Sequence, residues 1–498
     1  MIHSVENGIQ SYRTMNEKFL DIALKFKPKL NITKTVLKGH DIPLGEGSKD
    51  VYDFGNHFTG SIKISLKTEG RNPDAPLFFK LKFAELKDEL LEDSKDYHGW
   101  ISRSWIQEEY IHVDEFPSVV DIKRTFAFRY VEIEVLGISS LYKVLVDEIE
   151  LTSTTSANPL APRGNDKREE LIDKISLRTL SECMQEEFID GPKRDRRLWL
   201  GDLRLEAITN YETFKNYGLV KRCLYLFAGT ASEDGVIAQS VFTKPKVVPD
   251  EASMFDYSLL FIPTLLDYYE ATFDKETLLD LLPLAKKQID IARRRFYGDI
   301  INDSDQLGWC FLDWSLTLNK QAGAQAVYIY AENALVKILK YLGMDYKVYL
   351  EDANLKKKAA LAVFYDKNKG LFTSGKDKQI SYATNCWFIL SGILSEEDSA
   401  DLLERLEKCE EAIKPVTPYM YHHYVSALIS AGLYDKAYTV MMDYWGGMAD
   451  LGCDTFFELY NPKNKDESPY GGKVVNSYCH AWSTTPSYFL RKYYLKRR

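Results

Sequence analysis

The sequence predicts a multidomain β + α protein, with an N-terminal antiparallel β-sandwich followed by an (α/α)6 barrel. Three observations lead to this prediction. The chain has 498 residues, which is too long for one ordinary hydrophobic core. Apolar residues alternate with polar ones in the first third, whereas they recur at three- and four-residue steps in the rest. Between the two regions lies a segment with two prolines and a glycine, residues 156–170.

Residues 1–155 are expected to form the β-sandwich. Ile62, Ile64 and Leu66 alternate with polar residues, and the segments F-F-K-L-K-F (78–83) and Y-V-E-I-E-V (130–135) have the same period. A period of two with one polar face is typical of an antiparallel sheet that is wet on one side. Several such runs separated by turn residues favour a sandwich.

Residues 156–170 are expected to be a linker, and residues 171–498 a catalytic barrel of helices. Residues 323–342 illustrate the helical spacing, and Gly343 follows them as a stop signal. Twelve helical stretches with almost no strand signal fit six hairpins closed into an (α/α)6 barrel, and no repeat period indicates a solenoid. The stretches are 166–188, 202–217, 219–230, 254–271, 276–296, 323–342, 347–366, 382–392, 396–410, 418–431, 433–450 and 484–496.

The composition limits the partners and the compartment. The net charge is −9 without a basic block, which disfavours nucleic acid and an anionic membrane surface as partners. The sequence has no run of about 18 apolar residues that could span a membrane. Its first 13 residues have no basic stretch followed by an apolar one, so no secretory signal is expected.

The seven cysteines are scattered and form no C-x-x-C pair, which favours a reducing, cytoplasmic environment over a disulfide framework or a zinc knuckle. The adjacent His422 and His423 diverge on a helix, so no metal site is expected. No P-loop or dinucleotide fingerprint is present, and no cofactor is expected. The sequence leaves assembly into a homo-oligomer open.

The segment F-I-D-G-P-K-R-D-R-R-L-W-L-G-D (188–202) carries an unusual concentration of acids. Asp190, Asp195 and Asp202 lie among four basic residues, with Trp199 between them. Neighbouring carboxylates raise one another's pKa, whereas arginines lower it, and the sequence does not decide which effect dominates. A solvated, salt-bridged loop is the alternative, although such a loop seldom carries a tryptophan.

Three later segments also carry candidate site residues. In W-G-G-M-A-D-L-G-C-D-T-F-F-E (445–458), a helix is expected to end at Gly446-Gly447 or at Gly452, and Glu458 follows two phenylalanines. A carboxylate beside aromatic rings suits a general acid or base, but an ordinary glutamate on a helix or loop is the alternative. The segments 476–488 and 307–315 could equally be a capped helix start and a core hairpin. Their candidate ligands for a sugar are His480, Trp482, Asp313 and Trp314.

Taken together, these segments resemble the α-L-rhamnosidases, family 78 of the glycoside hydrolases. D-G-P-K-R-D-R-R-L-W-L-G-D is similar to the acid-bearing motif of the family. G-W-C-F-L-D-W, A-D-L-G-C-D-T-F-F-E and C-H-A-W-S-T-T-P-S-Y are similar to its later motifs, in the same order. Y-D-F-G-N-H-F-T-G-S and T-F-A-F-R-Y-V-E-I resemble its N-terminal β-sandwich. The resemblance covers most of the chain.

The resemblance implies an inverting hydrolase that releases terminal α-L-rhamnose, or a related sugar, from small glycosides or oligosaccharides. By this resemblance Asp195 matches the general acid and Glu458 the general base. Asp190 and Asp202 match residues that hold the hydroxyls of the sugar. The remaining expected substrate-binding residues are Arg194, Trp199, Asp313, Trp314, Trp445, His480 and Trp482.

Two departures from the family pattern keep other functions open. The acid at position 195 is the shorter aspartate where many members have glutamate, and Gly191 replaces a common cysteine. The alternatives are another (α/α)6 enzyme, such as an uronyl hydrolase, and a sugar-binding homologue without catalysis. Both candidate catalytic carboxylates are present, which favours an enzyme.

Overall fold

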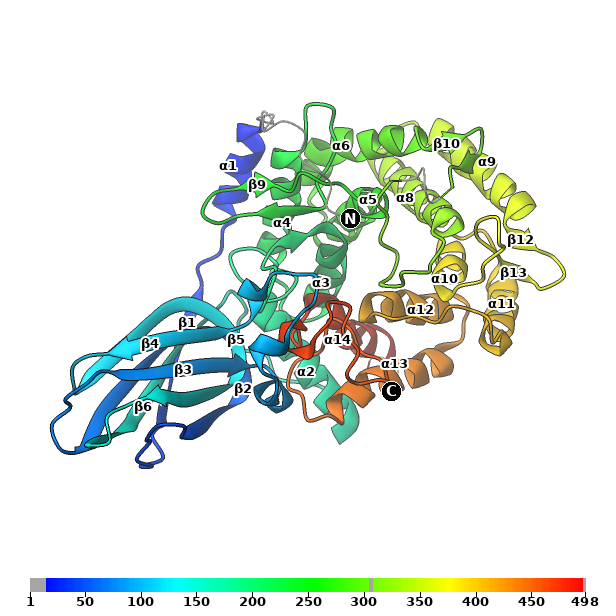
Figure 1. Ribbon diagram of the computed structural model, residues 1–498. Helices are drawn as coiled ribbons and strands as arrows, with labels where there is room; N and C mark the ends of the chain where they lie inside the picture. The colour runs from blue at the N-terminus through cyan, green and yellow to red at the C-terminus, as the bar shows by residue number, and fades with distance from the viewer. Residues whose placement is uncertain (1–14, 304–307, 496–498) are drawn as a thin grey trace.

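The computed structural model describes residues 15–303 and 308–495. Figure 1 shows an elongated sheet beside a larger body of helices. The N-terminal stretch without an expected secretory signal, residues 1–13, lies outside the described residues. So do Leu307, which begins one of the candidate segments, and the last residue of the helix expected at 484–496.

Six strands in the described part of the chain form one antiparallel sheet, in the order β1-β6-β2-β5-β3-β4. The expected antiparallel sheet is therefore confirmed, and its alternating apolar residues, such as Ile62, Ile64 and Leu66, are buried. The strands are β1 (Asn31–Lys38), β2 (Lys49–Gly70), β3 (Leu77–Ala84), β4 (Glu108–Val113), β5 (Ser118–Gly137) and β6 (Tyr142–Thr155).

The long strands β2 and β5 join two halves of this sheet. Their register shifts between Asp53 and Phe58 and again between Gly60 and Ile62, where β-bulges increase the local bend and twist. One apolar cluster contains residues of β3 and of β6, although these two strands do not pair with each other. The halves of one continuous sheet thus share a single core.

The first described element is a helix, α1 (Glu17–Lys25), which the sequence analysis did not predict. The side chain of Asn16 caps it by accepting a hydrogen bond from the Phe19 amide at 3.3 Å. The helix packs against α4 in the helical body, where the Asn16 amide donates to the Gly229 carbonyl at 2.8 Å. A side chain at Gly229 would collide with Leu20, so the glycine permits this close approach.

Thirteen α-helices lie within the described residues, and each of the twelve expected stretches overlaps one of them. A π-helical turn, Leu490–Tyr494, continues the last helix. The twelve are α2 (Lys167–Cys183), α3 (Leu200–Glu212), α4 (Tyr217–Thr230), α5 (Phe255–Thr272), α6 (Lys275–Arg293), α8 (Gln321–Leu342), α9 (Lys347–Val363), α10 (Tyr382–Leu390), α11 (Glu396–Lys408), α12 (Pro418–Ser430), α13 (Tyr434–Ala449) and α14 (Thr485–Phe489).

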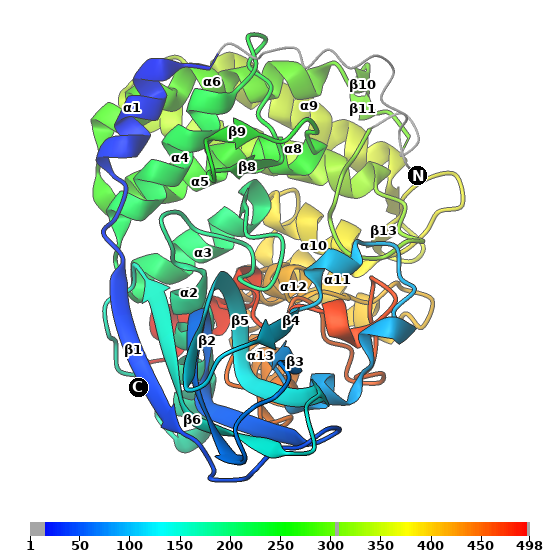
Figure 2. The same ribbon diagram turned by 60° about the vertical axis from the view of Figure 1, so that its left-hand side comes forward.

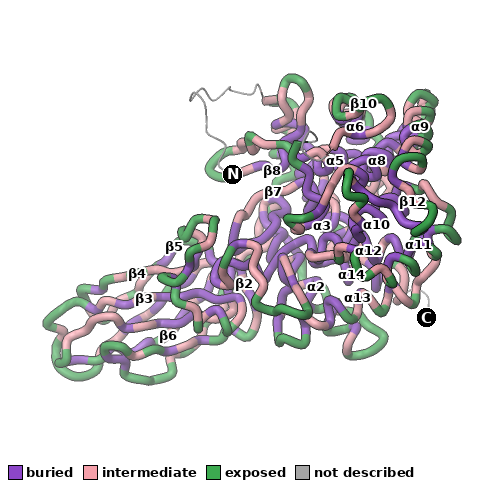
Figure 3. Tube along the Cα trace, turned by 45° about the vertical axis from the view of Figure 1, so that its right-hand side comes forward, coloured by how far each residue is buried: buried purple, intermediate pink, exposed green. Residues whose placement is uncertain are grey.

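Buried segments run through many helices of the helical body, as Figure 3 shows. Helix α3 contacts α5, and the contacts continue from α5 to α8, α10 and α12. Helix α12 contacts the short 3-10 helix η5 (Ala481–Ser483), which leads into α14, and α14 contacts α3. The last helical segment therefore packs against the first ones.

A buried ion pair joins these two ends of the helical series. Arg491 donates from Nε to Asp173 Oδ1 at 3.1 Å and from Nη2 to Oδ2 at 2.6 Å. The same carboxylate accepts from Ser487 Oγ at 2.6 Å and from the Arg163 amide at 2.7 Å. Asp173 lies on α2 and is fully buried, so all its charge is met by protein groups.

The expected helix end at Gly446-Gly447 is wrong, because α13 runs through both glycines to Ala449. A side chain at Gly446 would collide with Arg168, and one at Gly447 with the Tyr460 hydroxyl. These glycines therefore serve close packing within a helix. Gly452, with φ of +75°, has the left-handed backbone typical of a glycine after a helix.

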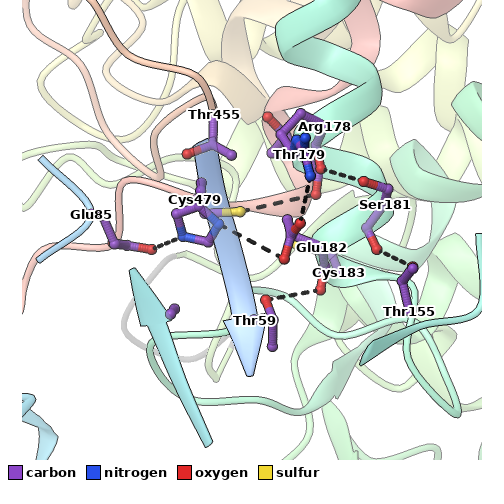
Figure 4. Close-up of polar contacts among 12 residues, drawn as sticks. Thr59, Glu85, Thr155, Arg178, Thr179, Ser181, Glu182, Cys183, Thr455 and Cys479 are labelled. Atoms are coloured by element: carbon purple, nitrogen blue, oxygen red, sulfur yellow. Dashed lines mark hydrogen bonds and ion pairs between the residues drawn. The ribbon is translucent and has the colours of Figure 1, made fainter. Parts of the chain in front are cut away.

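The sheet and the helical body meet at the C-terminal end of α2, which precedes the acid-rich loop (Figure 4). Thr155 Oγ1 of β6 donates to the Ser181 carbonyl at 2.5 Å, and Thr59 Oγ1 of β2 donates to the Glu182 carbonyl at 3.5 Å. The Cys479 thiol lies 4.0 Å from the Thr179 carbonyl. The sheet thus supports the end of α2, which the segment around Cys479 also contacts.

Candidate active site

The acid-rich loop between α2 and α3 is closed by Asp190. Its amide donates to the Arg197 carbonyl at 3.0 Å, and its Oδ1 accepts from the Arg197 amide at 2.9 Å. Burial, together with the nearby Asp195 and Asp202, raises the pKa of Asp190 well above its ordinary value. The loop therefore holds Asp190 and Asp202 as buried carboxyl groups close to each other.

His480 lies between two of these carboxyl groups. Its Nε2 is 4.0 Å from Asp190 Oδ2, and its Nδ1 is 3.7 Å from Asp202 Oδ1. Burial lowers the pKa of His480 well below its ordinary value, and burial raises the pKa of Asp202 well above its own. Both separations are too long for hydrogen bonds, so a neutral imidazole faces a carboxyl group that holds its proton to higher pH.

Glu458 is buried and contacts Arg194 of the acid-rich loop. Arg194 Nη2 donates to its Oε2, and the Tyr470 hydroxyl donates to its Oε1. Burial raises the pKa of Glu458, and Arg194 opposes this effect. The amide of Glu458 donates to the Ser477 carbonyl at 3.0 Å, which fixes the backbone beneath the carboxylate.

Asp195 has different surroundings from Glu458. Its side chain is half-buried, and no hydrogen bond or ion pair engages it within the described residues. The two carboxyl groups nevertheless influence each other electrostatically, since Asp195 raises the pKa of Glu458. The site therefore contains one anchored carboxylate and one that is open to a ligand.

These side chains line one cavity of about 500 Å³. Four buried polar atoms of its lining have no partner among the described residues, namely Trp199 Nε1, Asp202 Oδ1, Trp314 Nε1 and His480 Nδ1. Buried polar atoms are normally hydrogen-bonded, so they suit a ligand rich in hydroxyl groups. The lining residues are Trp100, Ile101, Trp105, Asp190, Arg194, Asp195, Trp199, Asp202, Met254, Tyr257, Trp309, Phe311, Asp313, Trp314, Ser315, Leu316, Leu318, Lys320, Glu458, Tyr470, His480 and Trp482.

Part of the lining comes from the N-terminal region, none of whose residues was expected in the site. Trp100, Ile101 and Trp105 lie between β3 and β4 and reach the mouth of the cavity. Two tryptophans within six residues of each other, Trp100 and Trp105, are the signal that could have suggested a binding role. Tyr470 was also missed, because nothing in its neighbourhood in the sequence indicates a contact with Glu458.

Comparison with known proteins identifies the family of this chain. Residues 19–153 match the profile of the glycosyl hydrolase family 78 alpha-rhamnosidase N-terminal domain, and residues 163–494 match that of the bacterial alpha-L-rhamnosidase 6 hairpin glycosidase domain. The chain belongs to glycoside hydrolase family 78. It is a glycoside hydrolase of the α-L-rhamnosidase type, as the sequence resemblance predicted.

Solved structures of family 78 enzymes are similar to this chain. A rhamnosidase from Klebsiella oxytoca, solved with rhamnose bound, is 37% identical, with a TM-score of 0.92 over 96% of this chain and 99% of that chain. A family 78 rhamnosidase of Bacillus sp. GL1 is 22% identical, with a TM-score of 0.77 over 91% of this chain and 47% of that chain, and supports the fold alone. A search of the curated proteins gives no match.

Ten of the eleven residues that the sequence assigned to the site of this family 78 enzyme line the cavity. The exception is Trp445, which is fully buried away from the cavity and donates from Nε1 to the Ser483 carbonyl at 2.9 Å. Its expected place in a sugar subsite is not supported, because the unbroken helix α13 turns this ring into the core, where its edge packs against the stacked rings of Tyr421 and Tyr444.

Asp313 lines the cavity but is already engaged by the protein. Its carboxylate accepts hydrogen bonds from Thr417 Oγ1 at 2.7 Å and from the Val416 and Thr417 amides at 2.8 and 3.1 Å. Burial raises the pKa of Asp313 to about 6. Thr417 caps α12, so Asp313 ties its loop, with the neighbouring Trp314, to the start of that helix.

Proposed function

We propose that the protein is an inverting glycoside hydrolase that releases terminal α-L-rhamnose, with Asp195 as general acid and Glu458 as general base. The observation that carries the proposal is that these two carboxyl groups, more than 260 positions apart in the chain, line the same cavity. The bound rhamnose of the Klebsiella oxytoca neighbour supports rhamnose as the sugar. Small glycosides and oligosaccharides suit a cavity of about 500 Å³.

In this mechanism Asp195 protonates the leaving oxygen, while Glu458 takes a proton from the water that attacks the anomeric carbon. Inverting enzymes hold the two carboxyl groups roughly 6.5–9.5 Å apart, so that a water fits between one of them and the sugar. The surroundings support this division, because Asp195 is open to the cavity and Glu458 is held by Arg194. The ionised form of Glu458 keeps free lone pairs for the water.

The remaining polar atoms are proposed to bind the hydroxyl groups of the sugar. Asp202 and His480 each leave a buried polar atom without a protein partner, and Asp190 faces the same imidazole. The indole N–H groups of Trp199 and Trp314 are further donors of this kind. An apolar ligand would leave all these groups unsatisfied, at a cost of about 1–3 kcal/mol each.

The proposal includes closure of the helices into an (α/α)6 barrel. The contacts from α3 through α12 to η5 and α14, and from α14 back to α3, support six hairpins arranged in a ring. Such a ring brings the loop after α2 next to the segment that carries Glu458 and His480. A cytoplasmic location is proposed as well, supported by seven free cysteines.

Aryl α-L-rhamnoside and a panel of other aryl glycosides test the proposal, with Asp195→Asn and Glu458→Gln alongside the wild type. We expect release from the rhamnoside, a large loss of kcat in both variants, and β-L-rhamnose as the first product by NMR. Equal release by wild type and both variants would refute the acid and base assignment. An α-configured first product would refute inversion. Sugar binding by calorimetry without release from any substrate would favour the non-catalytic alternative.

A further inference from the structure

Tyr470 contacts both Arg194 and Glu458, the ion pair that contains the proposed general base. Its hydroxyl donates to Glu458 Oε1, while Arg194 donates to Oε2 of the same carboxylate. The guanidinium carbon of Arg194 lies 3.8 Å from the centroid of the Tyr470 ring, which is a close cation–π contact. Tyr470 is 5% exposed, so this arrangement is shielded from bulk water.

The segment that carries Tyr470 is fixed by the N-terminal region of the chain. Tyr97 Oη donates to the Tyr470 carbonyl at 3.0 Å, and Trp100 Nε1 donates to the Pro469 carbonyl at 2.7 Å. A side chain on Gly99 would approach the Tyr470 carbonyl to 1.8 Å, so only glycine allows this contact. Figure 2 shows the segment between β3 and β4 beside the late part of the chain.

We propose that Tyr470 is a positioning residue for Glu458, and that Tyr97 and the segment around it act on catalysis by holding Tyr470 in place. This inference rests on the proposed function of Glu458 as the general base. By this inference the N-terminal region contributes to catalysis, because Tyr97 helps to hold the base although it lies more than 350 positions from Glu458 in the chain.

The geometry gives the physical reason. A carboxylate held at one oxygen can still rotate about its terminal bond, whereas hydrogen bonds at both oxygens fix its plane. Each oxygen then keeps a lone pair for the attacking water. Alignment of reacting groups contributes strongly to rate, so a base free to rotate would lower kcat more than it changes KM.

The Tyr470 hydroxyl also favours the ionised form of Glu458. Its hydrogen bond lowers the pKa of Glu458, against the burial that raises it. The charged and titratable groups that influence the pKa of Glu458 are Arg194, Tyr470 and Asp195, while Glu458 in turn raises the pKa of Asp190 and Asp202. Loss of the hydroxyl therefore raises the pKa of Glu458 further, and the acidic limb of the pH profile moves to higher pH.

Tyr470→Phe tests the inference in the full-length protein with aryl α-L-rhamnoside as substrate. We expect kcat to fall by about tenfold to a hundredfold, which corresponds to one hydrogen bond to a charged group. KM should change little, and the acidic limb of kcat/KM should move to higher pH. Tyr460→Phe is the matched control, since Tyr460 is two positions from Glu458 but lies outside the cavity lining.

Tyr97→Phe tests the role of the N-terminal segment. We expect a smaller loss of kcat in the same direction, and a double variant, Tyr97→Phe with Tyr470→Phe, no slower than Tyr470→Phe alone. Such non-additivity indicates that one residue acts through the other. Full additivity of the two losses would overturn the role assigned to Tyr97.

The outcomes separate this inference from the proposed function. If Glu458→Gln is inactive but Tyr470→Phe keeps the wild-type kcat and pH profile, the positioning role is refuted while the base assignment stands. If Tyr470→Phe and Tyr460→Phe lose activity equally with no movement of the acidic limb, the effect is structural and the inference is also refuted. If Glu458→Gln is fully active, the base assignment fails and the inference fails with it.

Discussion

Replacement of Arg491 by methionine is expected to lower the free energy of unfolding by about 3 kcal/mol. Removal of one partner of a buried ion pair typically costs about 3–5 kcal/mol, because the other charge stays buried without compensation. Asp173 is fully buried and would lose both hydrogen bonds from Arg491. It would keep those from Ser487 and the Arg163 amide, which places the loss at the lower end of the range.

A second ion pair serves as a matched control, because its arginine, Arg168, lies on α2, the helix that carries Asp173. Arg168 and Asp450 form an equally bidentate pair, with distances of 2.6 and 2.8 Å, but their side chains are 39% and 65% exposed. Exposed pairs contribute about 0–1 kcal/mol, so Arg168→Met should cost less than about 1 kcal/mol. Urea unfolding followed by far-UV circular dichroism measures both losses.

A second variant isolates the buried charge as the cause. Asp173→Asn combined with Arg491→Met leaves no unpaired charge in the interior, so the double variant should be more stable than Arg491→Met alone. Equal losses for Arg491→Met and Arg168→Met would refute the argument that burial decides the cost. If the double variant were less stable than Arg491→Met alone, packing rather than the unpaired charge would dominate the loss of stability.

Three further predictions concern residues of the site and Trp445. Burial raises the pKa of Glu458, so the acidic limb of the kcat/KM profile should lie above the ordinary pKa range of glutamate. A pH–rate profile measures this limb, and an acidic limb within the ordinary range would contradict the prediction. Burial also raises the pKa of Asp202, so its contribution to stability falls as pH rises above the usual aspartate pKa. Asp202→Asn should weaken this dependence in urea titrations and raise KM about tenfold; an unchanged KM would remove Asp202 from binding. Trp445→Phe should lower stability by about 1–3 kcal/mol through the bond lost to Ser483, with kcat and KM unchanged; altered KM would return Trp445 to the site.

Local periodicity was enough to predict most of the secondary structure. The alternation around Ile62 and the helical spacing of residues 323–342 reflect one buried face each, and that face is encoded in consecutive residues. Helix α1 was not predicted, although Asn16 is a typical N-cap residue, because the alternating pattern of the surrounding third of the chain predicts strands. Gly446-Gly447 was one of two expected helix ends, beside Gly452, because a glycine that permits close packing resembles a stop signal in the sequence.

The candidate site was predictable where a motif concentrates its chemistry in one segment, as around Asp195 and Glu458. The contacts between segments were not predictable. The bond from Tyr470 to Glu458 depends on the path of a loop, and the bond from Tyr97 to the Tyr470 carbonyl joins residues 373 positions apart. Trp445 lies beside a motif in the sequence, but the direction of its side chain is set by the register of α13.

The two segments that line the cavity, the acid-rich loop and the segment with His480, are also synthesised at different times. Ribosomes add about 5–20 residues per second, so the loop with Asp190 and Asp202 waits on the order of tens of seconds for His480. Until then its acids face water and release their protons at ordinary pH, as free aspartates do. Burial in the complete fold raises the pKa of Asp190 and Asp202, so the affinity of this loop for protons increases as the pocket closes.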